Sequence, residues 1–370
     1  VQSVLPVYRG IGVLLLLEWG WGCNLYIWDK YRVNYLSLLD LDSRSTMSYT
    51  EVFDEATTAS MMFLANFLLY FKVLRGDFPP WIPAGYFPIL LFLFMVYKLL
   101  PWSGRDRSVI WSALAQVALS PFGRVNFLTV YTGDILTSLV KPIIDWCYTL
   151  CFLVTLEWID DTVRDEMCLK SRLFNYVIIP LLSALPLWFR FMQCLRRYMD
   201  TRKRWPHLAN AGKYALSHSV VLFGVFHHTF TDPKAMDTYR VYWIISLVIS
   251  SLYSYVWDIF MDFGLGSSRH LLLRDQLMYT RRSVYYLSMI ADLFLRFAWS
   301  LTLVPRGDNS PFGGNVIVYL QPLLAMAEVI RRCMWGALRL EWEHIQVIGY
   351  KKVEGAAGVN GAAAVSYTHL

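Results

Sequence analysis

Charged residues are scarce in this sequence. Asp, Glu, Lys and Arg make up 17% of its 370 residues, whereas a soluble domain carries about 25%. Hydrophobic residues supply 56% and aromatic residues 16%, and the mean hydropathy is +0.38. This composition argues against an ordinary soluble domain. With 15 Trp and 23 Tyr, it indicates an all-α polytopic membrane protein whose aromatic side chains lie at the membrane interfaces.

Several functional signatures are also missing. The net charge is only +6 and no long basic arm occurs, so nucleic acid is not an expected partner. No GxSxG, HExxH or P-loop motif is present, the histidines have no metal-ligand spacing, and we expect no enzyme activity, metal or cofactor. Without a CxxC pair, the cysteines are interpreted as reduced, buried thiols: Cys23, Cys147, Cys151, Cys168, Cys194 and Cys333.

What the sequence does have is long apolar segments. A span needs roughly 17 to 25 mostly apolar residues, and we predict nine or ten spans. Nine lie at about 10–28, 58–75, 83–100, 143–158, 174–195, 211–229, 240–263, 284–304 and 316–338, and a tenth, interrupted one lies within 109–140. Ser, Tyr and charged residues interrupt many of them. Such helices suit a bundle with a polar interior.

Two basic loops predict the orientation. Residues 196–212 and 267–283 carry several arginines each and are separated by two predicted spans, so they lie on the same side of the membrane. The intervening loops, 229–240 and 305–315, are poorer in Lys and Arg. The positive-inside rule therefore places both basic loops in the cytosol.

The chain ends are unlike the middle. The sequence begins at Val1, without an initiator Met or a cleavable signal pattern, so upstream sequence is expected to be missing. Residues 347–370 end in an Ala- and Gly-rich stretch, "VEGAAGVNGAAAVSYTHL", which predicts a disordered or artefactual tail.

The informative residues are ionisable groups inside or at the ends of the spans. They are Arg190, Lys213, Asp258, Asp262, Arg296, Glu328, Arg331 and Arg332. Each one placed against lipid would cost on the order of 2.5–3.5 kcal/mol, and the sum would exceed the stability of an ordinary fold, roughly 5–15 kcal/mol. They must face a shared interior, pair with one another or contact water.

The charges in this set do not cancel. Five are cationic and three anionic, whereas a dry ion-pair network tends toward neutrality because an unpaired buried charge is destabilising. The surplus implies an anion that comes and goes, or water that screens the excess. The planar fork of Arg suits phosphate or carboxylate, and the carboxylates would hold the arginines while the site is empty.

Simpler interpretations remain open for single residues. Asp258 and Asp262 are near a helix end, where either could contact interfacial water. Arg331 and Arg332 are adjacent, so one of them could extend to the membrane interface. Lys213 follows a helix start and could be an ordinary cytosolic charge. Trp299, three residues after Arg296, could stack on a neighbouring arginine or narrow the path.

Several blocks of the sequence resemble one family. They are "WFRFMQCLRRYMDTRKRWPHLANAGKY", "YSYVWDIFMDFGL", "LRFAWSLTL" and "EVIRRCMWGALRLEWEH", joined by the earlier "GCNLYIWDKYRVNYLSLLDLDSRSTMSYTEVF" and "SPFGRVNF". In this order they resemble the EXS family, which includes the yeast Syg and Erd proteins, the animal xenotropic/polytropic retrovirus receptor and the plant PHO-type phosphate exporters.

The resemblance implies an inorganic phosphate exporter. In the family, the last six helices form a bundle around the anion pathway, and this bundle corresponds to residues 141–346. The helices of 1–140 pack outside the bundle and help to form a homodimer. Membrane lipids are the other expected partners. The phosphate-binding residues it implies are Arg190, Lys213, Asp258, Asp262, Arg296, Arg331 and Arg332. It also implies Trp299 as the aromatic that lines or gates the pathway, Glu328 as the acid that anchors the helix pair, and Asp42 as an acid after the first helix.

One feature of the family's exporters is missing. They carry a cytosolic SPX domain that senses inositol pyrophosphates, and no such segment precedes residue 10. The chain is therefore expected to be either a fragment or a short Erd-like member without inositol pyrophosphate control. The first would favour the plasma membrane and the second the Golgi, where Erd-like members are tied to phosphate recovery and enzyme retention.

Three functions compete at this point. A transporter would move phosphate by itself. A Golgi membrane protein of the Erd type would retain and recycle lumenal and glycosylating enzymes, with or without phosphate transport. An intramembrane phosphotransferase would need a nucleophile or metal near the arginines, and no such residues have suitable spacing.

Overall fold

A computed structural model describes residues 4–77, 83–101, 104, 107–156, 168, 171–226, 238–303 and 316–357. Every regular element in these ranges is a helix, which confirms the all-α prediction. The first seven are α1 (Leu5–Lys30), α2 (Tyr35–Leu38), α3 (Tyr49–Leu74), α4 (Tyr86–Leu99), α5 (Arg107–Ala118), α6 (Phe127–Ser138) and α7 (Val140–Val154).

The remaining helices follow from residue 174 onward. They are η2 (Phe174–Ile178) with α9 (Ile179–Thr201), α10 (His207–Phe226), α11 (Thr238–Trp257) with η4 (Asp258–Asp262), η5 (Ser268–His270), α12 (Arg282–Arg296) with η6 (Ala298–Leu303), and α13 (Val316–Ala357).

Five of the described helical segments are long and apolar enough to cross a membrane. They are Leu5–Lys30, Tyr49–Leu74, Phe174–Thr201, Thr238–Asp262 and Arg282–Leu301. The helices α6 and α7 together would make a sixth span, bent by 67°. The chain is thus a multi-pass membrane protein, and the larger count of nine to ten spans stays a prediction.

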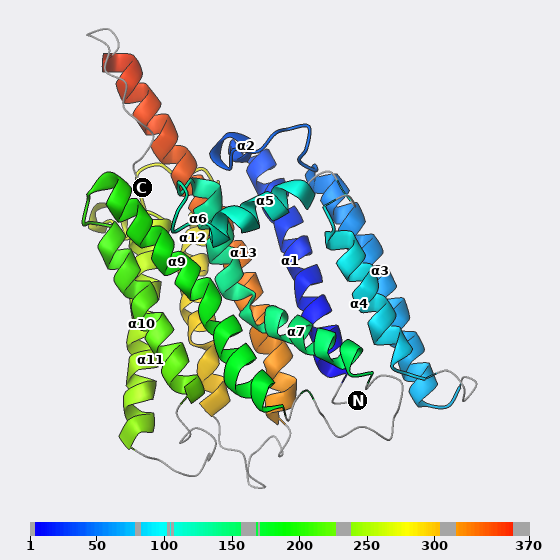
Figure 1. Cartoon of the computed structure of the whole chain (residues 1–370). Helices are drawn as coiled ribbons and strands as arrows, with labels where there is room; N and C mark the ends of the chain where they lie inside the picture. The colour runs from blue at the N-terminus through cyan, green and yellow to red at the C-terminus, as the bar shows by residue number, and fades with distance from the viewer. Residues whose placement is uncertain are drawn as a thin grey trace.

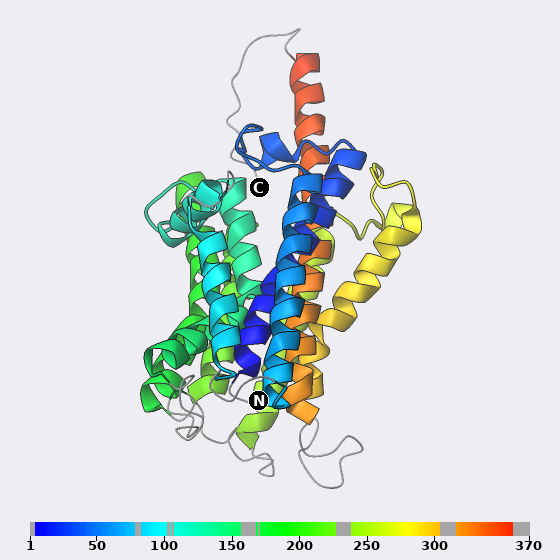
Figure 2. The same cartoon turned by 90° about the vertical axis from the view of Figure 1, so that its right-hand side faces the viewer.

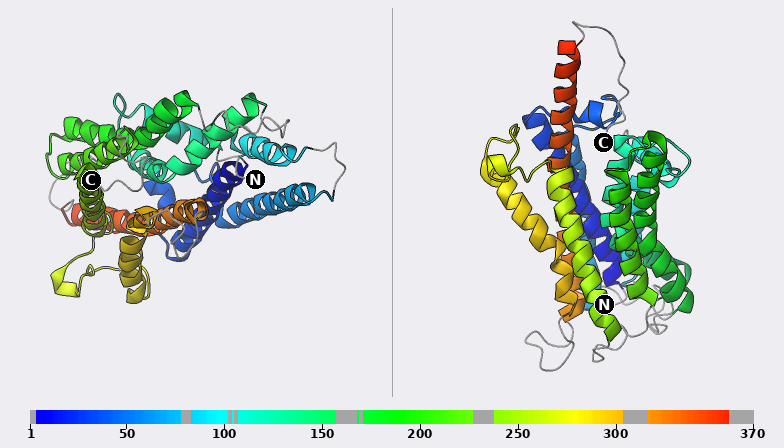
Figure 3. Two further views of the ribbon diagram at one scale, coloured as in Figure 1. Left: turned by 90° about the horizontal axis from the view of Figure 1, so that it is seen from below. Right: turned by 90° about the vertical axis from the view of Figure 1, so that its left-hand side faces the viewer.

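The helix α1 lies at the centre of the assembly (Figures 1 and 3). It packs against α3, α7 and α13, and it passes so close to α13 that a Cβ built at Gly20 would lie 2.2 Å from the Cys333 sulfur. Glycine is therefore required at this crossing. The helices α9, α10 and α11 stand on one side of α13, with α3 and α4 on the other (Figure 1).

The two basic loops lie at the same end of the bundle. Helix α9 ends and α10 begins at the upper end in Figure 1, and the segment between η4 and α12 lies at this end too (Figure 2). We call this the basic-loop end. The loop-side end of α12 leans away from the other helices there (Figure 2).

Helix α11 ends in a wider turn. In η4 the Phe263 N–H donates to the Asp258 carbonyl oxygen at 2.8 Å, which is the i→i+5 bond of a π-helix. Turns of this kind are frequent at functional sites. This one carries both aspartates whose spacing the sequence singles out, Asp258 and Asp262.

Two predictions are wrong in this structure. Cys151, near the end of α7, and Cys168 form a disulfide, so these two are not reduced thiols. Helix α13 continues to Ala357, so residues 347–357 are helical and not disordered, because the helix that carries the site simply extends beyond the bundle (Figure 1). The remainder of the predicted tail, 358–370, lies outside the described residues.

Candidate functional site

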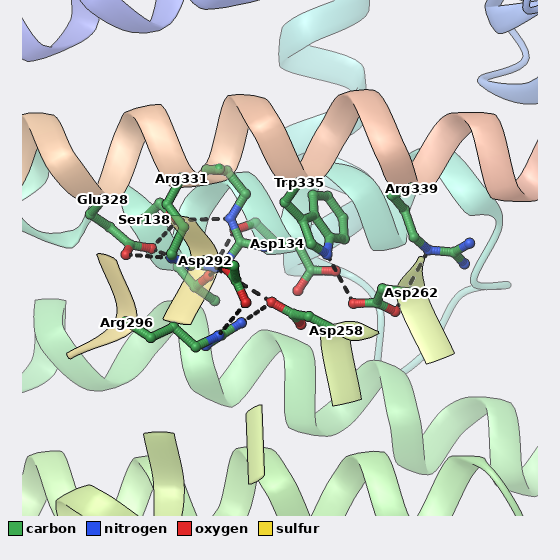
Figure 4. A network of polar contacts seen from close by, with 12 residues as sticks. Asp134, Ser138, Asp258, Asp262, Asp292, Arg296, Glu328, Arg331, Trp335 and Arg339 are labelled. Atoms are coloured by element: carbon green, nitrogen blue, oxygen red, sulfur yellow. Dashed lines mark hydrogen bonds and ion pairs between the residues drawn. The ribbon is translucent and has the colours of Figure 1, made fainter. Parts of the chain in front are cut away.

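One face of α13 carries a row of polar side chains (Figure 4). Glu328, Arg331, Arg332, Trp335 and Arg339 follow one another at spacings of one to four residues, and residues three or four apart are neighbours on a helix surface. Arg331 is 3% exposed, and Arg332 and Arg339 are 7% exposed. Neither of the adjacent arginines extends to the membrane interface, so both belong to the interior.

Two arginines share two aspartates at the centre of the network. Arg331 lies 3.3 Å from Asp292 (Nη1 to Oδ1) and 3.5 Å from Asp258 (Nη1 to Oδ2). Arg296 pairs with the same Asp258 oxygen and lies 3.3 Å from Asp292 (Nε to Oδ2). Arg331 also pairs with Glu328 at 2.6 Å (Nη2 to Oε1). We call these five residues the central cluster; they join α11, α12 and α13.

Asp262 contacts α13 one turn further along. Its carboxylate accepts from the Trp335 indole N–H at 2.9 Å and lies 3.7 Å from Arg339 (Oδ1 to Nε). Arg339 also donates to Glu343 at 2.9 Å. The two aspartates of η4 therefore have different partners: Asp258 joins the central cluster, and Asp262 lies toward the basic-loop end.

A second group of polar residues forms where α6 meets α9 and α10. Arg190 pairs with Asp134 at 2.8 Å (Nε to Oδ1), and the Tyr214 hydroxyl donates to the same Asp134 oxygen at 2.6 Å. Arg190 also donates to Gln193. A Cβ at Gly133 would lie 2.7 Å from the Arg190 Cδ, so glycine allows α6 to approach the arginine.

Lys213 is buried among aromatic rings. It is 6% exposed, and its ammonium lies 4.5 Å from the Tyr214 ring centroid and 5.1 Å from that of Trp257. Within the described part of the chain the Lys213 ammonium makes no ion pair or hydrogen bond. Lys213 is therefore not an ordinary cytosolic charge, because it is buried and its ammonium makes cation–π contacts with these two rings.

Arg332 also lacks a carboxylate partner within the described ranges. Its Nε donates to Ser138 at 2.8 Å and its Nη2 to Thr137 at 3.0 Å, and its guanidinium lies 4.8 Å from the Trp335 ring centroid. Hydroxyl groups and a ring orient this charge without neutralising it. Two buried cations are thus held in place but not compensated by a directly bonded acid.

A cavity opens beside Arg190 at the basic-loop end. Its lining includes Asp134, Arg190, Arg197, His207, Asp262 and Arg339. The residues of the central cluster do not line this cavity. Within the cluster, Arg296 and Arg331 are bonded directly to acids. Beyond the cavity, ion pairs join the helices.

The other two predicted site residues lie apart from this network. Trp299, in η6, donates its indole N–H to the Ser251 hydroxyl at 3.0 Å. Asp42 is exposed in the turn after α2 and accepts from the Arg44 backbone N–H at 3.1 Å. The structure does not bring Asp42 to the charged residues of the bundle.

The structure adds residues that the sequence interpretation missed. Asp134 and Asp292 are buried acids within apolar helices, and Arg339 and Tyr214 contact the predicted residues. The two aspartates cancel the surplus of two positive charges, and Glu343 offsets Arg339, so simple counting gives no evidence for an anion. The unequal pairing is the evidence: some of the cations form ion pairs with acids, whereas Lys213 and Arg332 form none with any described residue. Inspecting every acid inside a span would have found both aspartates.

A comparison with protein families identifies the chain. The EXS family profile matches residues 4–345. The chain belongs to the EXS family. The match includes the N-terminal helices as well as the predicted bundle of 141–346.

Curated relatives support the same assignment. The "SPX and EXS domain-containing protein 1" of Dictyostelium discoideum is 35% identical over 353 residues, which are 93% of this chain and 37% of that protein. The mouse "Solute carrier family 53 member 1" is 31% identical over 94% of this chain and 51% of its own length. The zebrafish "Xenotropic and polytropic retrovirus receptor 1 homolog" is 31% identical with the same coverage. The chain thus spans about half or less of the length of these relatives.

Proposed function

We propose that this EXS protein is a phosphate transporter, an exporter whose substrate follows the Arg- and Lys-lined network. The observation that carries the proposal is the pair of buried cations, Lys213 and Arg332, that form no ion pair with an acid among the described residues. A buried charge is costly unless it is compensated. A mobile phosphate would compensate both, and Arg and Lys are the side chains that bind phosphate in proteins. The name of the solute carrier relatives agrees with transport.

The remaining charged residues fit a path with two parts. At the basic-loop end, phosphate would enter the cavity beside Arg190 and meet Lys213, with Asp262 nearby. Deeper in the bundle it would exchange partners with Asp258, Asp292 and Glu328 on the arginines of the central cluster. These acids hold Arg296 and Arg331 while no anion is bound. They also weaken anion affinity, which release requires.

The ion pairs of the central cluster would then close the path in this conformation. They join α11, α12 and α13 beyond the end of the cavity. Opening would require phosphate, or a helix movement, to replace the acids around Arg296 and Arg331. Trp299 follows on η6 and would narrow the exit.

Two independent observations support the orientation that we propose. The basic-loop end would face the cytosol by the positive-inside rule. The Cys151–Cys168 disulfide is at the opposite end, where α7 ends (Figure 1), and disulfides persist in oxidising compartments such as the lumen or the cell exterior. Across a plasma membrane, a negative interior would favour anion exit by about 2.3 kcal/mol per charge per 100 mV.

The resemblance also implies a homodimer through the N-terminal helices, in the Golgi or the plasma membrane, and we include these as part of the proposal. In the Golgi, the same path would return phosphate from the lumen. An enzyme-retention protein of the Erd type would bind partners without needing the unpaired cations.

The test is phosphate flux in liposomes that contain only this protein. We expect Arg332→Ala to reduce the initial rate at least tenfold, because it removes a buried cation that no acid binds directly within the described residues. Arg107→Ala is the matched control: Arg107 is 8% exposed and pairs with Glu55 in the N-terminal helices. Equal rates for the two folded variants, or no flux with the unmodified protein, would contradict the proposal.

A further inference from the structure

A buried acid lies on the side of α13 that faces away from the network. Glu341 is 0% exposed and follows Arg339 by two residues, which places the two about 200° apart around the helix. Its carboxylate accepts from the Met278 backbone N–H at 2.8 Å and from the Tyr285 hydroxyl. Glu341 therefore connects α13 to the basic loop and to α12.

The partner of Glu341 is an arginine from that loop. Arg274 lies 2.6 Å from Glu341 (Nη2 to Oε2) and is only 7% exposed. It is one of the charges that the positive-inside rule counts, yet it is not in contact with solvent. Its Nη1 donates to the Phe263 carbonyl oxygen and its Nε to the Gln276 carbonyl oxygen.

The carbonyl that Arg274 binds belongs to the residue directly after Asp262. Phe263 is itself fully buried, and the chain then turns at Gly264 and Gly266, with φ of +61° and +92°. A Cβ at Gly264 would lie 2.4 Å from the Trp342 ring. The end of η4 is thus held between Arg274 and α13, and only glycine fits the turn.

We propose that Glu341 and Arg274 are positioning residues for Asp262, an inference that rests on the proposed transport function. Neither residue lines the cavity. Their ion pair sets where η4 ends, and so keeps the Asp262 carboxylate against Trp335 and Arg339 at the mouth of the path. Without it the end of η4 is released, Asp262 loses its fixed place, and Arg339 is no longer oriented for phosphate.

The inference is tested by a double-mutant cycle on the KM for phosphate in reconstituted full chain. We expect Glu341→Gln to raise KM at least threefold and to leave the maximal rate within twofold, since the central cluster is unchanged. Asp262→Asn should raise KM similarly. Because Glu341 acts through Asp262, the double variant should have the KM of Asp262→Asn alone. If Glu341→Gln does not fold, Arg274→Lys replaces it: lysine keeps the charge but cannot bind Glu341 and the Phe263 carbonyl together.

The control separates positioning from general stability. Asp145→Asn removes the acid of another buried ion pair, Arg9–Asp145 at 2.5 Å, which does not touch η4, and it should leave KM unchanged. An unchanged KM in Glu341→Gln, or fold-changes in KM that multiply in the double variant, would overturn this inference but not the proposed transport function. Unmodified protein that neither moves phosphate nor gains thermal stability from it would overturn the proposed function as well.

Discussion

At the scale of single residues, the evidence for an anion site comes from the partners of each charged side chain, and not from the sum of the charges. Eight of the predicted site residues are ionisable groups that the structure places in the interior of the bundle, in the central cluster and the contacts around it, which the cost of charge in a membrane explains. Their partners were not predictable, because pairing depends on which helices meet. Asp134 shows the difference: it lies in a segment too interrupted for a clear span prediction, yet it binds Arg190 and Tyr214.

Asp134 and Asp42 give a contrast at this scale. Asp134→Asn should lower the stability of the purified protein by about 3–5 kcal/mol, because it leaves Arg190 as a buried charge without its acid. Asp42→Asn should change stability by less than about 0.5 kcal/mol, because Asp42 is exposed in a turn. Thermal unfolding in detergent measures both. A greater loss of stability for Asp42→Asn would contradict the placement of these acids.

At the scale of elements, the sequence predicts where helices lie better than how they end. Five of the nine or ten predicted spans overlap the five long apolar helices of the described residues, and the larger count stays a prediction. Nothing in the spacing of Asp258 and Asp262 reveals that a π-turn carries them. That turn depends on tertiary contacts, among them Arg274 with the Phe263 carbonyl. Likewise, the pattern of apolar residues along each helix does not predict that α1 and α13 approach each other closely at Gly20.

The α1–α13 crossing yields a prediction. Gly20→Ala should destabilise the protein by about 1–3 kcal/mol, because its Cβ would overlap the Cys333 sulfur and force the helices apart. Gly12→Ala is the same change on the same helix, where the nearest atom, in the Phe63 ring, is 3.7 Å away. That variant should be neutral or slightly more stable, since alanine favours a helix. Equal melting temperatures for the two variants would show that the crossing is looser than described.

At the scale of the whole molecule, the two ends of the bundle differ in chemistry. Basic loops and a charged cavity lie at one end, a disulfide lies at the other, and ion pairs join the helices between them. The predicted charge surplus alone would not have established this, because Asp134 and Asp292 neutralise it. What remains is an interior in which Lys213 and Arg332 are held by rings and hydroxyls.

The central claim is that phosphate passes from the cavity beside Arg190 to these two cations, which lie behind its lining. Equilibrium binding of radiolabelled phosphate to the purified protein tests it most directly. The double variant Lys213→Met/Arg332→Met is compared with the unmodified chain and with a Lys98→Met control. In the control, the lysine that is removed pairs with Glu18 in the N-terminal helices. We predict saturable binding to the unmodified and control proteins and at least a tenfold weaker affinity in the double variant. Identical binding in all three would contradict the claim.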